Sequence, residues 1–181
     1  ALYSRAQHPG IPKLLYAAAG RKGLAAALSI FRGPTLEELA AQAGGRLSEA
    51  DALARLAEMT SLVAAVHAAN FLLLTAGLNS FILDAERRQV CLAGAEGCLP
   101  LESPAARQRL RDVLVLGLLE YLAPEQTLGP AKLCRATDIF GLGACFYRLL
   151  TGRAVYAAEA SLNEVLAQAR EGRIADVADL R

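Results

Sequence analysis

The residues from Tyr121 to Arg153 place the strongest constraint on how this chain folds. The first half of the stretch is a loop punctuated by proline and glycine, and it contains Ala123-Pro124-Glu125. The second half is apolar, and we expect a buried helix that starts near Ala136, carries Asp138 in its first turn and ends at Gly152. Other elements must therefore pack around this helix.

A second, longer helix is predicted between Leu47 and Ala69, a span that contains neither glycine nor proline. Ser48 is suited to cap its N-terminus, and Asp51 follows three residues later, close to a capping box. The length corresponds to about six turns. The spacing predicts that one face is formed by Leu53, Leu56, Thr60, Val63 and His67.

Shorter elements surround these two helices. Residues 1–7 are typical of the last turns of a helix, and Thr35 is expected to cap a short helix that ends at Gly44-Gly45. Ser161 is expected to cap a last amphipathic helix that stops at Gly172. Strands are predicted at Ile11–Ala19, Leu24–Phe31, Phe71–Leu74, Phe81–Leu83 and Val90–Leu92.

Composition excludes several classes of function. A net charge of +1 gives no indication of binding to nucleic acid or to an anionic membrane surface. The four cysteines contain no C-x-x-C pair, so neither a metal site nor a disulfide framework is indicated, and we expect a cytoplasmic setting. We expect no signal peptide and no membrane span. Residues 59–83 lack charge, but they include polar side chains that favour a buried helix, loop and strand.

Several strings, in this order, resemble successive parts of protein kinases of the bacterial Ser/Thr type. Ala123-Pro124-Glu125 resembles the A-P-E signature of that family. The other strings are HPGIPKLL, GPTLEELA, RLSEADALARLAEMTSLVAAVHAAN, DIFGLGACFYRLLTGR and SLNEVLAQAREGRI. The resemblance implies an α+β, mostly helical fold, truncated at both ends. Residues 1–31 would be a remnant of the small lobe, and residues 32–181 an incomplete kinase-like large lobe.

The residues that would carry phosphoryl transfer are replaced. The resemblance places the catalytic Asp at Thr75, the metal-binding Asn at Ser80 and the metal-binding Asp at Gly94. Threonine cannot accept a proton at neutral pH as a carboxylate does, and serine is a weak neutral metal ligand. Glu96 could be proposed as a displaced metal ligand, but an acidic residue in a solvated turn is the preferred interpretation, because the cluster that would share the ion is missing. We therefore expect no catalytic residue and no metal site.

Positions that support the kinase fold are retained. Asp138 corresponds to an Asp that ties down the catalytic loop, and only its backbone contacts could remain because Leu74 replaces the loop Arg. Glu125 has either no partner or a base other than the usual Arg. His67 is interpreted as a core histidine with a satisfied hydrogen bond. The backbone of Ser29, Ile30 and Phe31 corresponds to the segment that contacts adenine.

Three functional hypotheses follow. The first is a catalytically inactive kinase-like domain, a pseudokinase, that regulates or scaffolds a protein partner or other domains of the same polypeptide, without a cofactor. It would use the last helix and residues 94–117 as its surface. The second is a degenerate nucleotide-binding protein of the Ser/Thr kinase type that retains ATP binding. The third is an unrelated helical domain rich in alanine and leucine.

Overall fold

The computed structural model describes residues 2–20, 23–74, 77–94, 97–101, 119–156 and 161–174, and these form a mixed α+β fold. Its helices are α1 (Leu36–Gln42), α2 (Glu49–Ala68), α4 (Arg135–Thr151) and α5 (Leu162–Glu171). Its strands are β1 (Leu14–Gly20), β2 (Gly23–Leu28), β3 (Phe71–Leu72), β4 (Phe81–Asp84), β5 (Gln89–Leu92) and β6 (Leu99–Pro100). Short 3₁₀ turns cover Leu2–Ser4, Leu78–Ser80, Leu119–Tyr121, Pro124–Leu128 and Pro130–Lys132.

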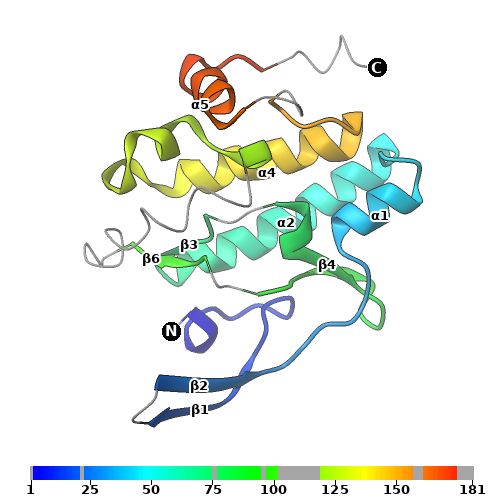
Figure 1. The fold of residues 1–181 in the computed structure, drawn as a ribbon. Coiled ribbons are helices and arrows are strands. Elements are labelled where there is room, and N and C mark those ends of the chain that lie inside the picture. The colour runs from blue at the N-terminus through cyan, green and yellow to red at the C-terminus, as the bar shows by residue number, and fades with distance from the viewer. Residues whose placement is uncertain are drawn as a thin grey trace.

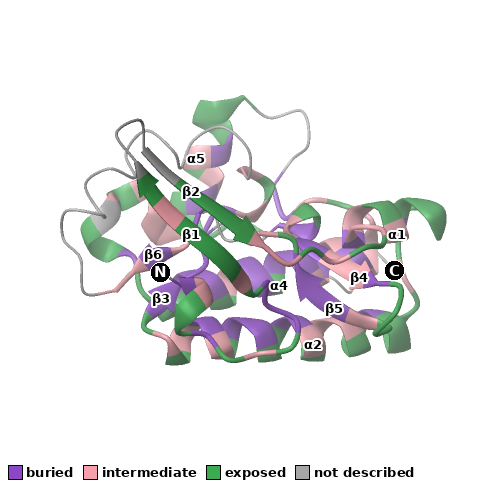
Figure 2. Cartoon of the chain, turned by 90° about the horizontal axis from the view of Figure 1, so that it is seen from below, coloured by how far each residue is buried: buried purple, intermediate pink, exposed green. Residues whose placement is uncertain are grey.

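Helices α2 and α4 lie side by side at the centre of the fold (Figure 1). Leu62 and Val66 of α2 belong to the same buried cluster as Cys145 and Leu149 of α4. Figure 2 shows that buried residues gather along these helices, whereas the β1–β2 hairpin is largely exposed. The prediction of a buried helix that starts near Ala136 is confirmed, and Gly152 ends it in the left-handed conformation (φ 72°).

The N-terminal caps that the sequence predicts are present. Thr35 Oγ1 accepts the Glu38 N–H at 3.1 Å, and the Glu38 carboxylate accepts the Thr35 N–H at 2.8 Å. Ser48 Oγ accepts the Asp51 N–H at 3.1 Å, and Ser161 caps α5 in the same way. Each such cap is worth about 1 kcal/mol.

The predicted face of α2 is wrong in part. Leu53 is 48% exposed and Thr60 is also exposed, whereas Val63 is buried as expected. The side chains that α2 buries are Ala52, Met59, Leu62, Val63 and Val66. Both sets fit a helical period, because alanine and leucine occur all around α2. The contacts of α2 with α4 and β5 select the second set.

In the part of the chain that the structure describes, the strands form three antiparallel pairs: β1 with β2, β4 with β5, and β3 with β6. Three predicted strands are shorter than expected, and one of them, β3, ends at Leu72 rather than at Leu74. Strand β1 begins at Leu14, because Gly10 and Ile11 pack into the core instead. Strand β2 ends at Leu28. The chain after it runs beside β4, where the Leu83 N–H donates to the Pro34 carbonyl at 2.9 Å.

Helix α5 packs on the opposite side of α4 from α2 (Figure 1). Val165 and Ala169 of α5 form a second buried cluster with Leu122 and Tyr156. The Tyr156 hydroxyl donates to the Leu122 carbonyl at 2.6 Å. Where the sequence predicted the end of an α-helix, the described residues 2–7 contain a 3₁₀ turn at Leu2–Ser4 instead. In the described part of the chain, every helix is too short or too polar to cross a membrane.

Candidate functional site

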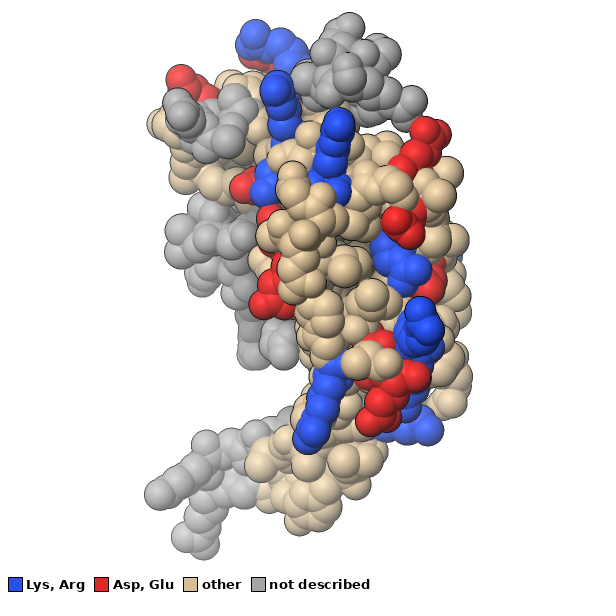
Figure 3. Space-filling view, turned by 90° about the vertical axis from the view of Figure 1, so that its right-hand side faces the viewer, with Lys and Arg blue, Asp and Glu red and all other residues tan. Residues whose placement is uncertain are grey.

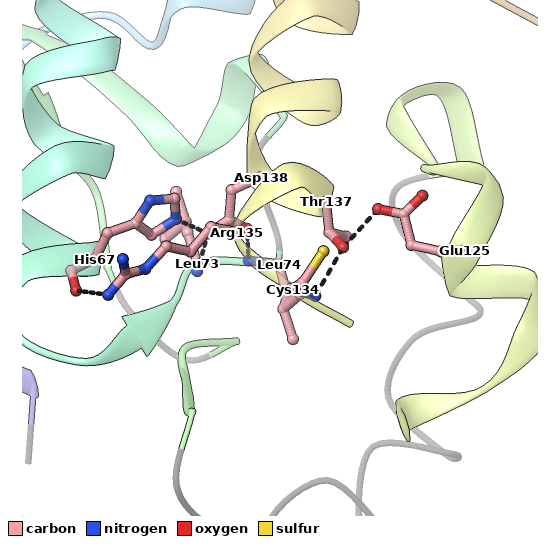
Figure 4. Close-up of polar contacts among 8 residues, drawn as sticks. All are labelled: His67, Leu73, Leu74, Glu125, Cys134, Arg135, Thr137 and Asp138. Carbon is pink, nitrogen blue, oxygen red and sulfur yellow. Dashed lines mark hydrogen bonds and ion pairs between the residues drawn. The ribbon is translucent and has the colours of Figure 1, made fainter. Parts of the chain in front are cut away.

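The candidate site is the segment that follows β3, where the backbone passes the first turn of α4. Asp138, which is 1% exposed, reaches this backbone from α4. Its Oδ2 accepts the Leu73 N–H and its Oδ1 accepts the Leu74 N–H, both at 2.8 Å (Figure 4). One carboxylate therefore holds two successive amides, as expected for Asp138 from the sequence.

His67 supplies a third contact to Asp138. Its Nε2 lies 2.7 Å from Asp138 Oδ2. Because the carboxylate is an acceptor, the proton of this bond lies on Nε2 of the ring. The carbonyl of His67 accepts a hydrogen bond from the Arg135 guanidinium at 3.2 Å. The end of α2 is thus joined to the start of α4, and the interpretation of His67 as a hydrogen-bonded histidine is confirmed.

The backbone that Asp138 holds is strained at Leu74, which has a φ of 57°. A bulky residue rarely adopts this left-handed conformation, and such strain costs on the order of 1–3 kcal/mol. Leu73 and Leu74 are both buried, so their amides have no access to solvent as an alternative partner. Asp138 therefore acts as a positioning group, and both of its carboxylate oxygens accept hydrogen bonds from these donors.

The positions assigned to metal ligands are close together in space. The Ala93 N–H donates to the Ser80 carbonyl at 2.9 Å, which places Gly94 beside Ser80. These two positions carry a hydroxyl and a hydrogen atom, whereas the kinase resemblance implies an amide and a carboxylate. Thr75 and Glu96 lie outside the described residues. Within the described ranges there is no cluster of three or more His, Cys, Asp or Glu that could hold a metal ion.

Glu125 is tied to α4 by a hydroxyl group. Its Oε1 accepts a hydrogen bond from Thr137 Oγ1 at 2.6 Å, and Thr137 is buried. Thr137 Oγ1 in turn accepts the Cys134 N–H at 3.2 Å. From the sequence, Glu125 was expected to have either no partner or a basic partner. Both expectations are wrong, because its partner is the hydroxyl group of Thr137. The loop of Ala123-Pro124-Glu125 is nevertheless fixed to the start of α4 (Figure 4).

The segment assigned to adenine contact is anchored at one end. The Ser29 N–H donates to the Lys13 carbonyl at 2.9 Å, so this amide already has a partner. Ile30 is exposed, and the Arg87 guanidinium lies 5.1 Å from the centre of the Phe31 ring. No carbonyl of the described residues accepts a hydrogen bond from the Ile30 or Phe31 amide.

Asp84 is a buried carboxylate that sequence reasoning missed. It accepts the Arg87 N–H at 2.8 Å and the Arg32 N–H at 3.2 Å. These backbone bonds, that of Arg87 first, hold the pKa of Asp84 below its usual value. An Asp that opens the turn between two strands is the signal that could have identified it.

The buried thiols are unreactive at neutral pH. Burial raises the pKa of Cys91 to about 11, and it raises the pKa of Cys145 further still. Cys134 is exposed at the N-terminus of α4. Cys91 and Cys145 are therefore packing residues rather than nucleophiles.

The site thus consists of a buried Asp138–His67 pair that holds a strained backbone, with aliphatic side chains on the held residues. A comparison with protein-family models finds no match to this chain, and a comparison with curated protein sequences finds none either.

Proposed function

We propose that the chain is a kinase-like large lobe without phosphoryl-transfer chemistry that acts as a regulatory or scaffolding protein-interaction module. The observation that carries this proposal is the pair of hydrogen bonds from the Leu73 and Leu74 amides to Asp138. The kinase resemblance implies an Asp that holds the catalytic loop in this way. Here the held residues are leucines, so the support for the loop is present and the reacting groups are not.

The chemistry of the neighbouring positions supports an inactive domain. Kinases position Mg²⁺ with an Asp and an Asn, because carboxylate and amide oxygens suit this hard cation. Ser80 and Gly94 occupy those positions and offer one neutral hydroxyl between them. Leu73 and Leu74 cannot accept a proton or bind a phosphate. A domain that keeps its loop support without these groups is suited to present a surface rather than to turn over a substrate.

The surface that we assign to a protein partner is the α5 face, defined by Leu128, Leu162 and Ile174. These three aliphatic side chains are exposed. Arg170 of α5 donates to Thr127 Oγ1 at 3.3 Å, which joins α5 to the turn that carries Leu128. We assign this face by analogy with the docking surfaces of kinase-fold domains. The second surface predicted from the sequence comprises residues 94–117. Of these, the structure describes Gly94 and residues 97–101.

Catalytic inactivity is tested by ATP titration with and without Mg²⁺, read out by thermal shift and by transfer of labelled γ-phosphate to protein. We expect neither a Mg²⁺-dependent rise in melting temperature nor transfer. A ligand that binds only the native state raises stability, so a clear Mg²⁺-dependent rise contradicts the proposal.

The α5 face is tested by cross-linking and co-purification with Leu162→Glu and Ile174→Glu. We expect both variants to lose the captured partner while their circular dichroism remains that of the wild type. Leu53→Glu is the matched control, because Leu53 is an aliphatic residue exposed on α2. Loss of capture in the control, or retention in both α5 variants, rules out this surface.

Residual nucleotide binding is the second candidate, and the exposed position of Ile30 favours it. Backbone hydrogen bonds to adenine do not depend on side-chain identity. This candidate predicts chemical-shift changes at the Ile30 and Phe31 amides when adenosine is added, in the absence of Mg²⁺. Unchanged amides at millimolar adenosine exclude it.

A further inference from the structure

Both ring nitrogens of His8 are used in the structure, and they connect the N-terminal segment to α2. The Gly10 N–H donates to His8 Nδ1 at 3.0 Å. Nδ1 must therefore be the unprotonated nitrogen of a neutral ring. The proton lies on Nε2, which is 3.1 Å from Ser61 Oγ on α2. A backbone donor thus selects one tautomer and excludes the doubly protonated ring.

The turn that His8 holds is closely packed. A Cβ atom at Gly10 would lie 2.9 Å from Leu62 Cδ2 and 2.9 Å from the Val90 carbonyl oxygen. The Gly10 carbonyl accepts the Leu92 N–H at 2.7 Å. This turn therefore touches both α2 and β5. The β1–β2 hairpin follows within a few residues, starting from the backbone contact between Lys13 and Ser29.

We infer that His8 is a pH-sensitive clasp, which holds the Gly10 turn against α2 and β5 when the ring is neutral and releases it when the ring is protonated. Protonation places an N–H on Nδ1, opposite the Gly10 N–H, so two donors then face each other. The bond is lost, and the root of the β1–β2 hairpin is no longer fixed to α2. This inference is independent of the kinase resemblance.

The direction of the effect follows from the environment of the ring. Burial lowers the pKa of His8 from its ordinary value of 6.5. The unfolded or released ring binds a proton more readily than the held ring, so the clasp is at full strength above pH 6.5 and weakens as pH falls below it.

The charged groups on the surrounding elements leave this direction unchanged. On α2, one and two turns before Ser61, Glu58 and Arg55 pair with each other at 2.8 Å. Arg5, on the segment of His8 itself, is exposed to solvent. The nearest titratable group on β5 is Cys91, whose pKa of about 11 keeps it neutral in this range.

The test is NMR of the 181-residue protein with ¹⁵N-labelled histidine, from about pH 7.5 to about pH 5, a range that spans histidine titration. We expect the Nδ1 shift of an unprotonated nitrogen at the upper end and a His8 pKa below 6.5. Hydrogen exchange, corrected for intrinsic rates, measures how often the Gly10 and Leu92 amides open. We expect this opening to become up to about tenfold more frequent per pH unit as the pH falls. His67 is the only other histidine, so assignment is simple.

Two variants separate the clasp from general acid loosening. In His8→Asn, the side-chain oxygen can accept the Gly10 N–H as in an Asx turn, but it does not titrate. We therefore expect pH-independent opening in this variant. Ser61→Ala removes the Nε2 partner but leaves Nδ1, so proton-linked opening should persist. A wild-type-like pH dependence in His8→Asn, or its loss in Ser61→Ala, overturns the inference.

Discussion

The β1–β2 hairpin and the junction of α2 with α4 are held together in opposite ways. The hairpin pairs residues that are near in sequence, from Leu14 with Leu28 to Gly20 with Gly23. Leu15 and Tyr16 on it are 67% and 66% exposed, and in Figure 3 its described surface at the lower end is largely uncharged. At the junction, Asp138 bonds to groups 64 to 71 positions away, and its carboxylate is buried.

This contrast separates two kinds of stability. A hairpin of two strands is marginal on its own, so its loss should cost the remainder of the fold little. The junction combines a buried charge with a strained backbone, and its parts depend on one another. Mutations at the two places should therefore differ in size and in how far their effects spread.

The largest effect is expected for Asp138→Ala. The change leaves the buried Leu73 and Leu74 amides without an acceptor and removes the partner of His67. We expect a loss of about 3–5 kcal/mol in the free energy of unfolding, the cost of breaking a buried charged network. Urea denaturation followed by circular dichroism measures it. Asp138→Asn is the control, since it keeps one acceptor oxygen and should lose less. A loss below about 1 kcal/mol would mean that the junction does not dominate stability.

A smaller effect is expected for Gly10→Ala, which lies between the two regions. The added methyl group meets Leu62 and the Val90 carbonyl at 2.9 Å, and the carbonyl belongs to the backbone and cannot rotate away. Overpacking of this kind costs about 1–3 kcal/mol. Gly143→Ala is the matched control, because a Cβ there meets nothing within 4 Å. Equal effects of the two substitutions, measured by urea denaturation, would show that the Gly10 turn is not tightly seated.

Asp84 should make the melting temperature fall more steeply as the pH is lowered into the acid range. Its pKa in the folded state is held below 3.8, chiefly by the Arg87 N–H. Its contribution is therefore present above pH 3.8 and is lost as the pH falls through the folded pKa. Asp84→Asn should flatten the melting temperature against pH in this window relative to the wild type. If the melting temperature of the variant falls at acid pH as steeply as that of the wild type, other carboxylates cause the loss of stability.

The sequence predicted what depends on neighbouring residues. The starts of α1, α2 and α5 and the end of α4 follow from Thr35, Ser48, Ser161 and Gly152, because caps involve residues within one turn. The kinase resemblance also led to the backbone contacts of Asp138. The assignment to that family itself stays a prediction.

Contacts between distant segments were less predictable. The buried stripe of α2 is chosen by α4 and β5, so Leu53 and Thr60 were assigned to the wrong face. Thr137 as the partner of Glu125 depends on how a loop meets a helix. A strand was expected to start at Ile11, and only the packed structure shows that Gly10, just before it, lies against Leu62 and Val90. Long-range packing overrides local pattern at each of these places.

The smallest effect is expected for Leu15→Ser and Tyr16→Ser in the hairpin. Both side chains are already mostly in water, so their removal should change the free energy of unfolding by less than about 0.5 kcal/mol. Hydrogen exchange sharpens the comparison, because the Ala17 and Ala26 amides should open without global unfolding, whereas the Leu73 amide should open only with it. If these substitutions lower stability by as much as Gly10→Ala, the hairpin is part of the same cooperative unit as the α2–α4 junction. The clasp at His8 would then act on the stability of the whole fold rather than on the position of the hairpin alone.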